Sequence, residues 1–70
     1  MVKVSRQLVR CLKRLEEMES RVAEARQAAH ESAAAGQYHA ADGWQRLAEQ
    51  HAATCERIRN NVWLLSQQQP

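Results

Sequence analysis

The stretch AAGQYHAADGW, residues 34–44, decides how this chain folds. Gly36 is one of only two glycines among the 70 residues. Glycine adopts the left-handed conformation that commonly ends a helix without steric cost. The stretch therefore predicts a tight turn at Gly36 and Gln37, with one helix ending before it and a second helix beginning at about Tyr38.

Apolar and small residues recur every three or four positions on both sides of this turn. Such spacing, kept over four heptads, is typical of long helices that pack along each other. The composition agrees, because good helix formers dominate and the sole proline is Pro70. The seam positions are Leu8, Cys11, Leu15, Met18, Val22, Ala25, Ala29 and Ser32, then Ala41, Trp44, Ala48, His51, Cys55, Ile58, Val62 and Leu65.

Folding the chain between Gly36 and Gln37 pairs residues whose numbers sum to 73. Every seam position of the first half then meets a seam position of the second half, and Trp44 meets the small residue Ala29. The sequence predicts an all-α, two-helix antiparallel hairpin with helices over about 5–35 and 38–66. Residues 1–70 form one domain, 67–70 a frayed polar tail, and Ser5 is a candidate helix cap.

A second copy of the chain is the predicted partner. One narrow seam in a chain this short supplies only ~3–5 kcal/mol of stability. Further apolar residues lie off the seam at the open end of the hairpin, where they would form an exposed patch. We expect a homodimeric four-helix bundle in which the dimer interface contains Val9, Leu12, Trp63 and Leu64.

The cysteines and histidines do not form a recognisable chemical site. Cys11 and Cys55 are offset by seven residues in the paired register, roughly 10 Å along the helix axis. That offset exceeds the reach of a disulfide, so two free, buried thiols are expected. His30, His39 and His51 lack metal-ligand spacing. His51 falls on the seam, where it is either a core residue or a pH-sensitive contact.

Neither an enzyme nor a membrane protein is expected. The chain has no glycine-rich phosphate loop and no paired inward carboxylates, so no catalytic residues and no cofactor are predicted. It also has no apolar run of about 18 residues. Because the first residues mix valines with basic side chains, they do not resemble a signal peptide. We expect a cytoplasmic protein.

Basic residues gather at the open end of the predicted hairpin. The net charge is only +2, so any general attraction to nucleic acid is weak. A solvated helical face explains the pattern, and a small nucleic-acid-binding or regulatory bundle is the alternative. The basic residues are Lys3, Arg6, Arg10, Lys13, Arg14, Arg57 and Arg59.

The turn end carries the residues best suited to bind another protein. Tyr38, His39, Trp44 and Arg46 lie among alanines and Gly43. Small neighbours cannot shield an aromatic ring, and Tyr, Trp and Arg are the residues that most often anchor protein interfaces. In the alternative interpretation, Trp44 is seam core and Tyr38 fills the turn. Gly43, unfavourable inside a helix, suggests close approach by a partner or by the neighbouring helix.

The element Tyr38-x-x-Ala41-x-x-Trp44, opening the second helix, resembles a family of small early proteins of temperate phages. Those homodimeric helical hairpins bind and inhibit a LuxR-type transcription activator and the type IV pilus assembly ATPase. The resemblance implies a phage-encoded inhibitor that acts on a larger host protein in the bacterial cytoplasm. It also implies that Tyr38 and Trp44 contact that protein.

Overall fold

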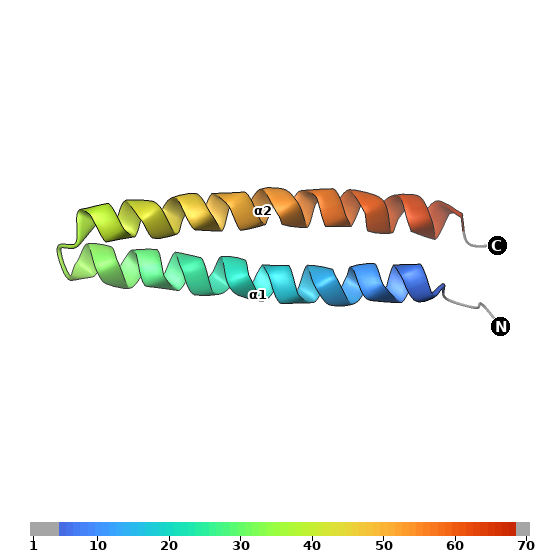
Figure 1. The fold of residues 1–70 in the computed structure, drawn as a ribbon, viewed down its shortest axis with the longest axis horizontal. Helices are drawn as coiled ribbons and strands as arrows, with labels where there is room; N and C mark the ends of the chain where they lie inside the picture. The colour runs from blue at the N-terminus through green and yellow to red at the C-terminus, as the bar shows by residue number, and fades with distance from the viewer. Residues whose placement is uncertain (1–4, 69–70) are drawn as a thin grey trace.

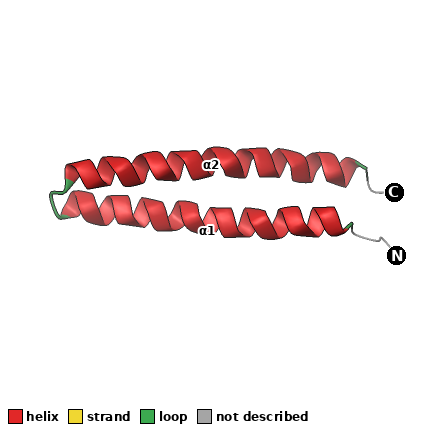
Figure 2. Ribbon diagram, in the orientation of Figure 1, coloured by secondary structure: helices red, strands yellow, loops and turns green. Residues whose placement is uncertain are grey.

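The computed structural model describes residues 5–68 and consists of two antiparallel helices. Helix α1 spans Arg6–Ala34 and helix α2 spans Tyr38–Gln67. The two helices lie side by side along their whole length (Figure 1), and only a short loop interrupts the helical structure (Figure 2). The predicted all-α hairpin is confirmed, and residues 5–68 contain no strand.

Helix α1 begins at a side-chain cap. Ser5 has an extended backbone, and its Oγ accepts a hydrogen bond of 3.1 Å from the Leu8 N–H. The Ser5 carbonyl accepts the next bond, from the Val9 N–H, also at 3.1 Å. The first bond satisfies a donor that the first helical turn leaves without an intrahelical partner, and the second is the first regular bond of the helix. The predicted cap at Ser5 is confirmed.

The turn is closed by a paired hydrogen-bond motif around Gly36. Its φ of 79° lies in the left-handed region. The Gly36 N–H donates to the Ala33 carbonyl at 3.0 Å, and the Gln37 N–H donates to the Ser32 carbonyl at 2.8 Å. Two such bonds around a left-handed glycine form a Schellman motif. The Gln37 carbonyl then accepts from the Ala41 N–H at 2.9 Å, which starts α2 directly.

The core is the predicted seam, with one exception. Every predicted seam residue is buried or half-buried apart from Trp44, which is 42% exposed. A tryptophan is too large to be covered by the small side chains near the turn, so its pairing with Ala29 hides only part of it. Within residues 5–68 no large side chain is completely buried. The buried residues are Leu8, Val22, Ala25, Ala29, Ala48, Cys55 and Ile58.

The far end of α2 extends slightly beyond its expected limit. Gln67, predicted to belong to the polar tail, is the last helical residue, and Gln68 caps the helix through its backbone. The remainder of that predicted tail, residues 69–70, lies outside the described residues, as does the segment 1–4 with Lys3.

Candidate interaction surfaces

The turn end presents two aromatic side chains to solvent. Tyr38 is 73% exposed and Trp44 is 42% exposed. Tyr38 is the first residue of α2, directly after the Schellman turn. The residues that precede it, from Ala33 to Gln37, are alanines, glycine and glutamine, which leave the ring uncovered. Tyr38 is therefore not a core residue of the turn.

The four predicted partner-binding residues do not form one flat patch. Successive helical residues turn by about 100°, so His39 and Arg46, seven apart, lie one above the other with Tyr38 beside them. Trp44 points about 120° away from Tyr38, toward the edge of the seam. The Arg46 Nη2 lies 3.0 Å from Asp42 Oδ2 in an exposed ion pair. A partner protein would have to wrap around the end of the hairpin to contact all four.

Gly43 does not mark a close approach between the two helices. A Cβ added at Gly43 would meet no atom of the described residues within 4 Å. The neighbouring-helix explanation of this glycine is thus wrong. Approach by a partner protein remains a prediction.

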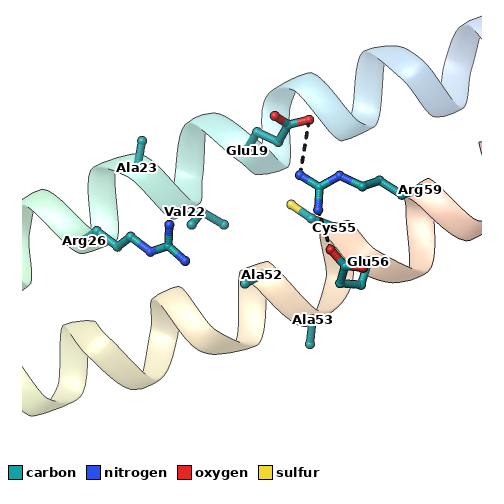
Figure 3. A pocket seen from close by; sticks show the side chains of 9 residues that line it. All are labelled: Glu19, Val22, Ala23, Arg26, Ala52, Ala53, Cys55, Glu56 and Arg59. Carbon is teal, nitrogen blue, oxygen red and sulfur yellow. Dashed lines mark hydrogen bonds and ion pairs between the residues drawn. The ribbon is translucent and has the colours of Figure 1, made fainter.

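A shallow groove lies between the two helices near the middle of the hairpin (Figure 3), with a volume of about 400 Å³. Arg59 closes one end of it. The Arg59 Nη2 lies 3.9 Å from Glu19 Oε1 on α1, and its Nη1 lies 2.5 Å from Glu56 Oε1 on α2. We call this side of the hairpin the groove side; its lining residues are Glu19, Val22, Ala23, Arg26, Ala52, Ala53, Cys55, Glu56 and Arg59.

The predicted dimer residues at the open end are all exposed, but they do not share one side. Leu12 lies seven residues before Glu19, Val9 fourteen before Ala23, and Trp63 seven after Glu56. Because residues seven apart lie on the same helical stripe, these three belong to the groove side. Leu64 points about 100° away from Trp63. The exposed fractions are 51% for Val9, 46% for Leu12, 59% for Trp63 and 46% for Leu64.

Protein-family models, curated proteins and solved structures were compared with the chain, and none of them matches it. The surfaces of the hairpin therefore have to carry any inference of function. The groove is one such surface that the sequence pattern did not reveal. Its signal was present in the alternation of short Ala23 and Ala52 with long Arg26 and Arg59 on the stripes beside the seam.

Both cysteines are free thiols with different environments. Cys55 is 2% exposed, as predicted, whereas Cys11, also predicted to be buried, is only half-buried. His51 is half-buried on the seam, while His30 and His39 are exposed. Among residues 5–68 no three potential ligands converge on a metal position. Neither of the two helices, as described, is long and apolar enough to cross a membrane.

The basic residues of the open end that the structure describes are solvent-exposed. Arg59 differs from the others, because Glu19 and Glu56 already neutralise it. Two glutamates, Glu16 and Glu17, follow directly after this basic segment on α1. The exposed basic residues are Arg6, Arg10, Lys13, Arg14 and Arg57.

Proposed function

We propose that this chain is a non-catalytic protein-binding module whose turn end contacts a larger bacterial protein and blocks a surface on it. The observation that carries the proposal is the exposure of Tyr38, 73%, at the tip of a rigid helical turn. An exposed aromatic ring on a well-ordered backbone loses little conformational entropy when a partner covers it. His39 follows it directly, and Arg46 lies about 12 Å further along α2; both supply polar contacts.

A protein is the partner that this surface suits best. The turn end combines aromatic rings, a guanidinium and a backbone left open at Gly43, which are features of protein interfaces. The resemblance of Tyr38-x-x-Ala41-x-x-Trp44 to phage inhibitors supports a target of the same kind. In that case the target is a LuxR-type activator or the ATPase of type IV pilus assembly, and the chain is a phage protein that works in the host cytoplasm as a homodimer.

The second candidate is a nucleic-acid-binding bundle, favoured by the exposed arginines and lysine of α1 near the open end. Their charges are offset by the glutamates that follow on the same helix, and the net charge of the chain is +2. Nucleic-acid binding draws most of its affinity from phosphate neutralisation. The turn-end proposal therefore has the stronger support.

Affinity capture from a bacterial lysate tests the proposal. Wild type, Tyr38→Ala and Trp44→Ala are compared with the control Ser20→Ala, which changes an exposed residue in the middle of α1, away from the turn end. We expect one bacterial protein to be retained by wild type and control, and retention to fall at least tenfold with Tyr38→Ala. Circular dichroism and light scattering confirm that each variant keeps its helices and its mass.

Purified LuxR-type activator and pilus ATPase are then added directly to the captured chain, to identify the target. Capture that disappears after nuclease treatment, or that depends on Arg10 and Arg14 rather than on Tyr38, would instead establish the nucleic-acid candidate.

A further inference from the structure

We propose that a second copy of this chain lies antiparallel across the groove side, with α1 on α1 and α2 on α2 of the second copy. Each end of the dimer then joins the open end of one copy to the turn end of the other. This places Trp63 of one copy beside Tyr38 of the second. The surface offered to a target protein would thus be built from both copies.

The hairpin buries few large apolar side chains, and its groove side is broad enough for a second copy to cover. Its buried residues are mostly alanines and single aliphatic side chains, while Trp63 and Leu12 on the groove side remain about half exposed. The broad side of the molecule, seen in Figure 1, measures 54 by 16 Å. That area is of the order of the ~800 Å² that each partner buries in a standard interface.

In an antiparallel arrangement, the acidic residues of α1 on the groove side face basic residues of α1 of the second copy. If residues whose numbers sum to about 45 meet across a twofold axis, Glu19 meets Arg26 of the second copy, and Arg26 meets its Glu19. Glu16 meets His30 in the same way, since their numbers sum to 46. Leu12 then covers Ala33, and the small Ala23 lies at the axis, where the two helices can approach closely.

The same twofold axis also determines which residues of the two α2 helices face each other. Within one hairpin, the numbers of facing residues sum to 73, so the point between residues 22 and 23 of α1 faces the point between residues 50 and 51 of α2. Residues of the two α2 helices that meet across the axis therefore have numbers that sum to 101. Arg59 then meets Asp42 of the second copy, and Trp63 meets Tyr38. The contact between the two aromatic rings is favourable. The opposite charges of Arg59 and Asp42 help to fix the register of the interface.

A parallel arrangement of the two copies fits less well. It places α1 over α2 of the second copy at equal heights, so that Glu16 and Glu19 approach Glu56. Like charges facing each other across an interface are unfavourable. Exposed apolar residues meet other apolar residues in both arrangements, so the charges decide between them.

The shared surface rests on the proposed function, because it assigns Trp63 of the second copy to the target-binding end. The dimer itself does not depend on the proposed function, and it can be tested in the absence of a target protein. The test uses Cys11→Ser as background, since Cys55 is 2% exposed and is not expected to react in the folded chain. Tyr38→Cys and Trp63→Cys are made in separate chains, mixed and oxidised.

A covalent dimer is expected from the mixture of Tyr38→Cys and Trp63→Cys chains. The two residues lie at opposite ends of α2, so a disulfide between them must join two copies. Ala23→Cys alone should also cross-link, and Arg21→Cys should not, because Arg21 is exposed about 160° around α1 from Ala23. Cross-linking of Trp63→Cys with itself, or none in the mixture, overturns the arrangement.

Charge reversal tests the register independently. Glu19→Arg and Arg26→Glu should each halve the mass measured by light scattering, because each places two like-charged pairs across the axis. Mixing the two variants gives two opposite-charged pairs and should restore the dimer mass. Glu17→Arg, on another stripe of α1, should leave the mass unchanged. If both single variants remain dimeric, or the mixture remains monomeric, the proposal is wrong.

Discussion

Arg59 reaches from α2 across to α1, where its Nη2 lies 3.9 Å from Glu19 Oε1. Both side chains are about half exposed, 48% and 50%. An ion pair in such a position is screened by water and constrains two long side chains, so it contributes about 0–1 kcal/mol. The contact therefore adds little to the stability of the hairpin, although it shapes the groove.

We predict that Arg59→Ala lowers the free energy of unfolding by less than about 1 kcal/mol. Its neighbour Ile58 is only 8% exposed, and Ile58→Ala should cost about 2–5 kcal/mol, because it leaves a cavity in the seam. Urea denaturation at one fixed chain concentration measures both. Equal losses for the two variants would show that the ion pair is far stronger than its exposure indicates.

The two glycines should respond in opposite directions to replacement by alanine. Gly36 has a φ of 79°, and an alanine forced into that region costs about 1–2 kcal/mol. Gly43 lies inside α2 with open space around it, so Gly43→Ala should stabilise the helix by about 1 kcal/mol. Thermal denaturation followed by circular dichroism gives the sign of each change. If Gly43→Ala stabilises the chain and also weakens capture of a target, a partner approaches the backbone there.

Loss of the cap at Ser5 should destabilise α1. Ser5→Ala removes the acceptor of the Leu8 N–H bond, and such losses typically cost about 1 kcal/mol. Ser20→Ala is the matched control, since Ser20 is exposed in the middle of α1 and alanine is the better helix former there. Chemical denaturation should therefore give a lower free energy of unfolding for Ser5→Ala and a higher one for Ser20→Ala. A neutral Ser5→Ala would mean that the first turn of α1 is frayed in solution.

The two thiols should differ sharply in reactivity. Cys11 is half-buried and Cys55 is 2% exposed. Because the attacking thiolate must be accessible, a thiol reagent such as DTNB should modify one cysteine per chain readily and the second only on unfolding. Cys11→Ser should remove the fast phase. Two fast thiols per chain would indicate that the hairpin opens along its seam.

The fold followed from the sequence because two independent patterns agreed. The heptads around Val22 and Ile58 fixed which side of each helix is buried, and Gly36 fixed where the chain reverses. Trp44 occupies a seam position and is still 42% exposed, as its small neighbours indicated, because a heptad position says which way a side chain points and not whether its neighbours can cover it. Near the turn those neighbours are small.

The surfaces were less predictable than the fold. The groove depends on the contrast in length between Ala23 and Arg26 or between Ala52 and Arg59, which a pattern of apolar residues does not register. The predicted dimer residues were chosen by hydrophobicity, which does not register that Leu64 points about 100° away from Trp63. Side-chain direction, and not composition, separates these residues.

The short Schellman turn has a practical consequence for anyone who attaches the protein to a surface. Because α1 begins and α2 ends at the same end of the rod (Figure 1), an affinity tag or fluorophore fused to either terminus would project from that end. The Tyr38 end of the same chain would then point away from the support. Immobilised through either terminus, a single hairpin would leave its turn end accessible and hold its open end close to the support, so such an assay reports on the turn end alone.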